Sequence, residues 1–385
     1  MKIEKVLIIG GGIGGLTLAI ALHRAGIPCT VFERAPELKE VGAGVGVWAN
    51  AVKVLDRLGV GDSLREIGMP LAVAELCSDT GRVLSAANLT EVVREAGAAC
   101  YVLHRAELHA ALAEQLPEGA IKTDHECVGL EETGAGVTAH FANGASAEGT
   151  LVVGADGINS VVRAQLWGRE KPRFSGQTAF RAVVKFDVPD KRVMREAHGA
   201  GKRFGICPMS KDRIYWYAAF NAPEGRMIDF DKRQKLLLEE YKDWCGQAPD
   251  IIAATPSETI LQNDLVDRVP IKRWSKGAIT LLGDAAHPTT PNFGQGACMA
   301  IEDAMVLTRN LLRHANLRDA LQSYEGERAK RTTSIVKQSW AFGMLARVKN
   351  PLVVRVRELL VRATPEFLIQ QTLRSQAGFD AGDLS

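Results

Sequence analysis

One stretch decides the fold of this chain: Val6-Leu7-Ile8-Ile9-Gly10-Gly11-Gly12-Ile13-Gly14-Gly15. Four apolar residues in a row are typical of a parallel strand buried on both faces, and the glycines after them favour a tight turn. Residues 16–25 are rich in helix formers and end at Gly26, so we expect a helix there. A second strand at residues 28–32 ends at Glu33. This order predicts a strand–helix–strand unit that binds a dinucleotide.

The glycines of this turn have different tasks. Gly10 permits the tight turn, Gly12 lets a pyrophosphate approach the backbone, and Gly15 lets the helix pack closely on the strand. Phosphates would meet free N–H groups at the helix start. Glu33 can accept hydrogen bonds from ribose hydroxyls; the alternative is a tight turn with an incidental surface Glu. The predicted contacts of the turn are Gly10, Gly12, Ile13, Gly14 and Gly15.

Composition points to a globular protein that handles small molecules. The 385 residues are 46% hydrophobic and 24% charged, with a formal net charge of +2. Such a balance gives no global field for nucleic acid or anionic lipid. We recognise no secretory signal and no apolar run long enough to span a bilayer. The seven cysteines form no Cys-x-x-Cys pair, so neither a disulfide framework nor a metal site is expected, and a reducing cytoplasm is the predicted location.

A second glycine-rich segment selects the kind of dinucleotide. The apolar run at residues 279–282 predicts another buried strand, and Asp284 follows at its tip, where it can accept from a sugar hydroxyl. Gly294, Gln295 and Gly296 then open a helix that continues from Ala297. The N–H groups and dipole of that helix start would stabilise negative charge on the ring of a reduced flavin. Together the two segments predict FAD, and not nicotinamide, as the resident cofactor.

Four motifs in this order resemble the class A flavoprotein monooxygenases, whose FAD domain is of the p-hydroxybenzoate hydroxylase type. The resemblance covers nearly the whole chain. Its discriminating motif is the Asp156-Gly157 pair, which ordinary NAD dehydrogenases lack. The motifs are the glycine turn with Glu33-Arg34, His104-Arg105-Ala106-Glu107-Leu108, Gly154-Ala155-Asp156-Gly157 with its continuation to Arg163, and Gly283-Asp284 with Gly294-Gln295-Gly296.

The resemblance implies further FAD contacts. Asp284 would accept from a ribityl hydroxyl, although it can also be a turn acid. Arg105 could hold a phosphate or ribityl oxygen with its guanidinium fork, or form a helix-start salt bridge. The turn at Asp156 would serve both FAD and incoming NADH or NADPH. Arg34 and Val128 are also expected to contact FAD. The glycine-dense segment 41–50, where some members have a basic residue at Gly42 or Ala43, would line the path of a mobile flavin ring or be a flexible connection.

The main part of the predicted substrate region lies between the third and fourth FAD motifs. Residues 174–271 alternate like strands and should form a β-sheet over the flavin, joined by strands from residues 73–100. We therefore expect a discontinuous FAD-binding domain (1–72, 101–173 and 272–340), a substrate domain (73–100 and 174–271) and C-terminal helices (341–385). The fold class is α/β, with a Rossmann-like parallel sheet interleaved with the substrate sheet.

Candidate substrate residues follow from a likeness to the bacterial urate hydroxylases and the quinolone and salicylate hydroxylase branch. Arg203 and Tyr215 match an Arg and a Tyr that face substrate in the urate hydroxylases, but they can also be ordinary sheet-surface residues. Asn292 stands where urate hydroxylases have Asp, so urate itself is not implied. His287 is expected to make a structural hydrogen bond and not to act as a base. Further candidates are Arg181 and Tyr217 for substrate, and Pro291 near the reactive flavin carbon.

The predicted activity is hydroxylation of a small electron-rich aromatic ring, hydroxylated or N-heterocyclic. The resemblance implies that NADH or NADPH reduces FAD, that O2 adds to give a flavin C4a-hydroperoxide, and that the distal oxygen passes to the ring. Arg203 would stabilise the ring anion and Tyr215 would orient it. Epoxidation, reduction or non-catalytic flavin binding on the same fold are the alternatives, and the protein is expected to be a monomer or a homodimer.

The C-terminal helical part carries an apolar face that we expect to pack against the protein, not to anchor it to a membrane. The residues of that face are Leu352, Val356, Leu359, Leu360 and Ala363.

Overall fold

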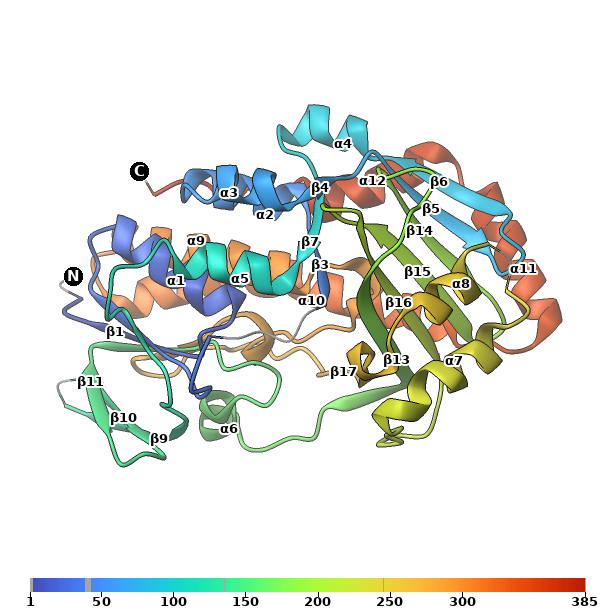
Figure 1. Ribbon diagram of the computed structural model, residues 1–385. Helices are drawn as coiled ribbons and strands as arrows, with labels where there is room; N and C mark the ends of the chain where they lie inside the picture. The colour runs from blue at the N-terminus through green and yellow to red at the C-terminus, as the bar shows by residue number, and fades with distance from the viewer. Residues whose placement is uncertain (1–2, 39–42, 135, 245, 385) are drawn as a thin grey trace.

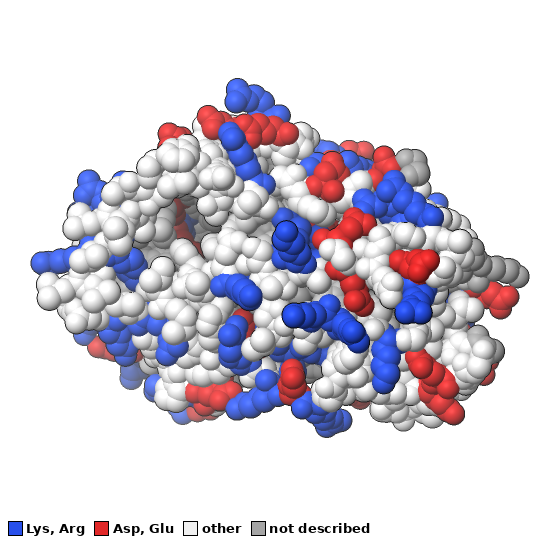
Figure 2. All heavy atoms as spheres, turned by 180° about the vertical axis from the view of Figure 1, so that it is seen from behind, with Lys and Arg blue, Asp and Glu red and all other residues white. Residues whose placement is uncertain are grey.

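The computed structural model of the protein describes residues 3–38, 43–134, 136–244 and 246–384. It confirms the predicted mixed α/β class: a parallel sheet lies beside a larger sheet, and the C-terminal part is helical (Figure 1). Basic and acidic side chains are interspersed over the rear face, in keeping with the small net charge (Figure 2). The expectation about Gly42 falls outside the described residues.

The parallel sheet forms around the apolar run that decides the fold. Its strand order is β18-β12-β1-β2-β8, and every neighbouring pair is parallel. Every residue of β1 and β12 is buried, as expected for strands covered on both faces. Because parallel strands end at one edge, the turns after β1, β12 and β18 meet there. The strands are β1 (Val6–Ile9), β2 (Cys29–Phe32), β8 (Ile121–Lys122), β12 (Leu151–Gly154) and β18 (Ile279–Leu281).

Helices cover this sheet and bring distant motifs together. Helix α1 (Ile13–Arg24) packs along α9 (Gly296–Arg313) and α5 (Arg105–Ala113), so the helix starts of three sequence motifs share one region (Figure 1). Gly14 permits the close approach of α1 to α9, since a Cβ there would lie 3.0 Å from Ala300 Cβ of α9. The remaining helices of this part are α2 (Ala49–Arg57), α3 (Gly61–Ile67), α4 (Leu89–Ala96), α6 (Val161–Trp167) and α10 (Leu317–Ala346).

The larger sheet has the order β17-β13-β16-β15-β14-β5-β6 and is antiparallel except for the β14–β5 pair. Helices α7 (Arg233–Tyr241) and α8 (Ala248–Ala254) cover one face, where Trp216 and Tyr241 are buried. The other face is turned toward the parallel sheet. The strands are β5 (Val73–Ser78), β6 (Val83–Asn88), β13 (Arg173–Lys185), β14 (Val193–His198), β15 (Lys202–Pro208), β16 (Arg213–Asn221) and β17 (Leu261–Asp267).

Two small sheets complete the fold. The first has the order β3-β7-β4, and its strand β3 (Gly44–Val47) runs antiparallel to β7 (Tyr101–His104). Part of the glycine-dense segment, for which a flexible connection was the alternative expectation, is therefore a paired strand, with Gly44 opposite His104. The other strands are β4 (Met69–Pro70) in this sheet, and β9 (Cys127–Thr133), β10 (Gly136–Phe141) and β11 (Ser146–Gly149) in the second.

The last two helices are α11 (Pro351–Ala363) and α12 (Glu366–Ala377). The expectation that the apolar face of α11 packs against the protein is wrong: Leu352 is 71% exposed and Leu360 66% exposed. Helix α11 instead lies on β6 with its opposite side, where Val354 and Glu358 are buried. Among the described residues, no helix is long and apolar enough to cross a membrane.

Candidate active site

A cavity of about 760 Å³ lies between the parallel sheet, the larger sheet and α12. It explains how residues that are far apart in the sequence could form one site. Other walls come from the residues around β3 and from Ile369 and Leu373 of α12. The sequence-predicted residues that line it are Gly12, Ile13, Gly14, Arg105, Arg181, Arg203, Tyr215, Tyr217, Asp284, Pro291, Asn292, Gly294, Gly296 and Ala297.

The glycine turn has the geometry that a dinucleotide phosphate needs. Gly10 has φ +109°, and a Cβ there would lie 2.4 Å from the Ala155 carbonyl oxygen. A Cβ on Gly12 would meet no atom within 4 Å, so its backbone is open toward the cavity. At Gly15, by contrast, a Cβ would lie 2.0 Å from the Gly10 carbonyl oxygen. The tight turn falls on Gly10 and the close packing on Gly15, and Gly12 leaves room for the predicted approach of a phosphate.

Neighbouring side chains hold this turn in place. The Glu33 carboxylate accepts hydrogen bonds from Gly11 N at 2.7 Å and Ala35 N at 2.9 Å. Glu33 is not part of the cavity wall, so its predicted ribose contact would have to form at the outer end of the site. His109 of α5 is buried, and its Nε2 lies 2.6 Å from the Gly11 carbonyl oxygen, so it connects α5 to the turn. The sequence analysis did not identify this residue.

Asp284 faces the cavity from the short helical turn Gly283–Ala285 that follows β18. The side chain is open to the cavity but surrounded by protein, and this burial raises the pKa of its carboxyl group, while the charges of His287 and Arg105 oppose the rise. Arg105 also lines the cavity, at the start of α5. A carboxylate acceptor and a guanidinium donor therefore share one wall, as a polar chain of hydroxyls and phosphates requires.

The start of α9 presents backbone N–H groups to the cavity. Gly294 has φ +62°, which reverses the chain into the helix, and Gly296 and Ala297 are the first helical residues. Groups in a first helical turn have no partner inside the helix, and both residues line the cavity. The open Gly12, the Asp284 carboxylate and this helix start fit FAD, and they are the groups that would hold its phosphates, its ribityl chain and its ring system.

Besides Gly10, Gly15 and Glu33, four other predicted cofactor residues do not line the cavity. The Asp156 carboxylate accepts from Ser160 Oγ at 2.5 Å and Val161 N at 2.7 Å, so it caps α6, while its neighbours Ala155 and Gly157 are the cavity residues. Gln295 is 1% exposed and points into the protein. The other two are Val128, which is 57% exposed on β9, and Arg34, after β2.

A buried ionic cluster forms the other end of the cavity, on the larger sheet. Arg203 is 2% exposed and its Nη1 lies 3.6 Å from Glu196 Oε1. His198 Nε2 lies 2.7 Å from the same oxygen, and the Tyr217 hydroxyl donates to Glu196 Oε2. Burial alone would raise the pKa of Glu196, but His198, Arg203 and Tyr217 lower it to about 2. Sequence reasoning missed Glu196, because strand alternation does not tell which acid on a sheet faces a cavity.

Tyr215 and Arg181 extend this cluster. Burial raises the pKa of Tyr215 to about 12, against the effect of the nearby Arg181 guanidinium, so its phenol is protonated at neutral pH. Arg181 Nη2 donates to Asn263 Oδ1 at 2.7 Å. The Tyr215 ring packs against Gly44, where a Cβ would lie 2.2 Å from Tyr215 Cγ. The structure therefore brings Arg203, Tyr215, Tyr217 and Arg181 together.

Pro291 and Asn292 lie between the two ends, just before α9. Asn292 Nδ2 donates to Thr290 Oγ1 at 3.0 Å and to the Ser339 carbonyl oxygen at 2.6 Å. Its Oδ1 has no hydrogen-bond partner among the described residues. Because this Oδ1 is itself buried, Asn292 contributes to the cavity wall a side chain held in place by its two hydrogen bonds, and not an exposed acceptor.

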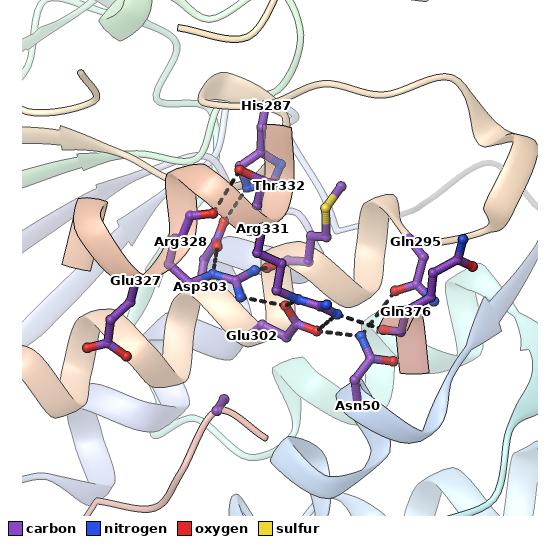
Figure 3. Close-up of polar contacts among 12 residues, drawn as sticks. Asn50, His287, Gln295, Glu302, Asp303, Glu327, Arg328, Arg331, Thr332 and Gln376 are labelled. Carbon is purple, nitrogen blue, oxygen red and sulfur yellow. Dashed lines mark hydrogen bonds and ion pairs between the residues drawn. The ribbon is translucent and has the colours of Figure 1, made fainter. Parts of the chain in front are cut away.

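A network of buried charges supports the site from behind α9 (Figure 3). His287 Nε2 lies 2.6 Å from Asp303 Oδ2, which confirms the structural hydrogen bond expected for His287. Asp303 also accepts from Gly283 N at 3.0 Å and from Arg328 Nε at 2.6 Å. Arg328 Nη1 in turn lies 2.6 Å from Glu302 Oε2, so the turn that carries Asp284 is fastened to two helices.

Comparisons with known proteins agree with this geometry. A family model described as an FAD binding domain matches residues 4–339. The chain is 39% identical to aurachin C monooxygenase/isomerase of Stigmatella aurantiaca, over 93% of each chain. It is 33% identical to an FAD-dependent urate hydroxylase of Klebsiella pneumoniae, over 86% of this chain and 88% of the relative. The crystal structure of Klebsiella pneumoniae HpxO with FAD and uric acid matches with a TM-score of 0.92 and 29% identity, over 98% of each chain. The chain therefore belongs to the FAD-binding class A aromatic monooxygenases and is a flavoprotein monooxygenase.

Proposed function

We propose that the protein hydroxylates a small electron-rich aromatic ring, using NADH or NADPH and O2. One observation carries the proposal: a single cavity connects Gly12, Asp284 and Gly296 with the ionic cluster around Arg203. An FAD held along the first wall would bring its ring system toward that cluster. When bound, FAD supplies the exchange of electrons with NAD(P)H and O2 and the transfer of one oxygen atom to the ring.

The residues around the ring end would bind and orient the substrate. Arg203 can hold an oxygen or nitrogen of the ring that becomes more negative during oxygen transfer. The protonated Tyr215 phenol can donate to the same part of the ring. Asn292 lines the cavity and would contact the ring there. Pro291 would stand close to the reacting face of the cofactor. Tyr217 already donates to Glu196 and would act by positioning that carboxylate.

Next to Arg203, the charges of the cluster favour an uncharged part of the substrate, while the Arg181 guanidinium, which donates to the neutral Asn263, also lines the cavity. Arg203 is already paired with Glu196, whose pKa of about 2 keeps it ionised at neutral pH. An anionic ring would meet a guanidinium whose charge is largely balanced and a carboxylate that repels it. A neutral ring with an N–H or O–H group can use both partners. We infer a hydroxylated or N-heterocyclic substrate, and the urate named for one relative is an N-heterocycle.

The pairing of strands in the larger sheet supports the proposed division of the chain into domains. We propose a discontinuous FAD-binding domain (1–72, 101–173 and 272–340) and a substrate domain (73–100 and 174–271). Pairing of β5 with β14 supports the assignment of residues 73–78 to the substrate sheet. The C-terminal part (341–385) would close the cavity, since α12 lines it.

The proposal can be tested with the holoprotein and a panel of neutral and anionic ring compounds. A true substrate should accelerate NAD(P)H oxidation and yield a product that contains one more oxygen atom, while hydrogen peroxide formation stays low. Arg203→Gln should retain FAD but lose product formation, whereas the exposed Arg355→Gln should behave as wild type. The proposal fails if no ring compound accelerates NAD(P)H oxidation, or if the Arg203 variant forms product at the wild-type rate.

A further inference from the structure

The exposed face of α11 is apolar in a way that the interior of the protein does not explain. Leu352, Val356, Leu359, Leu360 and Ala363 follow the helical repeat and share one side of the helix. Leu352, Val356, Leu359 and Leu360 are 71%, 54%, 61% and 66% exposed, respectively. We call these five residues the α11 face. Contiguous apolar exposure of this kind marks an interaction surface more often than an accident of packing.

Basic residues border the α11 face. On a helix with 3.6 residues per turn, Arg355 and Arg362 fall along one margin. Arg357 falls along the other, where its guanidinium donates to the carbonyl oxygens of Leu345 and Gly199. Residues 344–363 contain five basic residues and one acidic residue, Glu358. Glu358 is buried on the opposite side and pairs with Arg82 at 2.6 Å. The exposed surface of α11 therefore combines an apolar strip with a basic border.

The apolar surface continues from α11 to the cavity. Phe367 and Leu368, at the start of α12, are 67% and 41% exposed. Leu368 also lines the cavity, together with Ile369 and Leu373. Figure 2 shows a hollow on the rear face that is bordered mainly by uncharged atoms. The α11 face thus adjoins the wall through which a substrate could enter.

We propose that the α11 face and the start of α12 rest on the surface of an anionic lipid bilayer, with the cavity next to that surface. An apolar strip bordered by arginines matches an interfacial helix, whose apolar side chains enter the acyl boundary while its cations contact anionic headgroups. A second copy of this chain fits less well, because symmetric pairing of two such faces would bring their basic borders together. The contact is peripheral, since α11 lies along the surface and does not cross the bilayer.

The proposal stands apart from the catalytic assignment. Docking depends on the residues of α11 and α12 alone, and it can be measured without any substrate. Its consequence for catalysis, that a membrane-dissolved ring compound reaches the cavity directly, rests on the proposed function. Vesicle binding therefore tests the docking proposal, and turnover of ring compounds tests the proposed hydroxylation, so that one can fail without the other.

Vesicle flotation of the full-length holoprotein tests the docking. The probes are vesicles of phosphatidylcholine alone and of phosphatidylcholine with phosphatidylglycerol. Wild type should float with the anionic vesicles and bind them more tightly than the neutral ones. The double variant Leu359→Asp with Leu360→Asp should bind the anionic vesicles at least about tenfold more weakly than wild type. The matched control is Met227→Asp, because Met227 is 60% exposed in the segment between β16 and α7 and should not affect binding.

Charge and folding controls complete the experiment. Arg355→Gln with Arg362→Gln should reduce the preference for anionic vesicles. FAD absorbance and the melting temperature should stay as in wild type; if the double variant does not fold, Leu352→Asp takes its place. The proposal is overturned if wild type does not float, if the leucine variants float as wild type does, or if sedimentation shows a dimer that the leucine variants dissociate, since the face would then cover a second copy.

Discussion

Asn50 Nδ2 donates a hydrogen bond of 3.1 Å to Gln295 Oε1, so the side chain just before α9 points into the protein and not into the cavity. Asn50 Nδ2 also lies 2.5 Å from Glu302 Oε1 and so joins α2 to the buried charges (Figure 3). The glycine-rich helix start can thus meet a cofactor through its backbone, while Gln295 fixes the position of that backbone.

Gln295→Ala should therefore affect stability more than cofactor binding. We expect a loss of about 0.5–1.5 kcal/mol in the free energy of unfolding, because one buried hydrogen bond disappears. The FAD dissociation constant should change little. Urea denaturation and fluorescence titration with FAD measure the two quantities. Gly296→Val is the contrasting variant: its side chain would enter the cavity and weaken FAD binding. A Gln295→Ala protein that folds normally but no longer binds FAD would contradict this assignment.

Asp284→Ala should weaken FAD retention in a protein that still folds. A hydrogen bond to a charged group contributes about 1.5–3 kcal/mol, so the FAD dissociation constant should rise roughly 10- to 150-fold. Because burial raises the pKa of Asp284, wild-type FAD affinity should also fall as the pH falls through that raised value. Fluorescence titration at several pH values measures this. Tight FAD binding by the Asp284→Ala variant would show that the ribityl chain is held elsewhere.

The ionised Asp284 carboxylate should favour FAD binding but lower the free energy of unfolding of the apoprotein. A carboxyl group whose pKa is raised on folding binds its proton more tightly in the folded state, so its ionised form destabilises the fold above that pKa. Asp284→Asn should increase the unfolding free energy of the apoprotein at neutral pH, and the increase should shrink as the pH falls through the raised value. Denaturation of both apoproteins across pH gives the comparison. If the free energy of unfolding of Asp284→Asn exceeded that of wild type by the same amount at every pH, this ionisation effect would be ruled out.

Glu196→Gln should change both acid stability and substrate charge preference. The pKa of Glu196 is held at about 2, below its ordinary 4.5, so its contribution to stability is complete above pH 4.5 and is lost as the pH falls toward 2. Asp303 also has a pKa lowered to about 2, so only the difference between wild type and the Glu196 variant isolates this residue. The difference in the free energy of unfolding between wild type and Glu196→Gln should become smaller as the pH falls. Denaturation at each pH measures it.

In the same variant, Arg203 loses its ionic partner. Ring compounds with a carboxylate should then inhibit more strongly relative to their carboxamide analogues, and the ratio of inhibition constants measures this change. Tyr217→Phe is the control that keeps the Glu196 charge while removing one hydrogen bond. An unchanged ratio in Glu196→Gln would mean that the cluster does not select substrate charge.

The sequence predicts the cofactor half of the site better than the substrate half, for a physical reason. Gly10, Gly12 and Gly15 are defined by local backbone geometry, which a short motif encodes. The partner of Arg203 depends on which side chains of β14 and β15 face the same cavity, and this register is set by tertiary packing. Helix α11 shows the same limit: its apolar repeat is plain in the sequence, but the repeat does not tell whether protein or another surface covers it.

Gly44 and Gly46 offer the sharpest test of how Tyr215 is positioned. Both lie in β3 and line the cavity, two residues apart, so their added methyl groups would point to the same side of the strand. At Gly44 a Cβ would lie 2.2 Å from Tyr215 Cγ, whereas at Gly46 the nearest atom, Trp48 Nε1, is 3.6 Å away. Gly44→Ala must therefore displace the Tyr215 ring, while Gly46→Ala should leave it in place.

Displacement of a substrate-orienting group by about 1 Å can reduce turnover on the order of 100-fold. We expect Gly44→Ala to lose product formation to about this extent while it keeps its FAD, and to resemble Tyr215→Phe in substrate affinity. Gly46→Ala should keep substrate affinity close to wild type. Product yield, FAD content and inhibitor binding of the three variants make the comparison. If Gly44→Ala turns over normally, or if both glycine variants lose substrate affinity equally, then the contact between Gly44 and Tyr215 does not position the ring for catalysis.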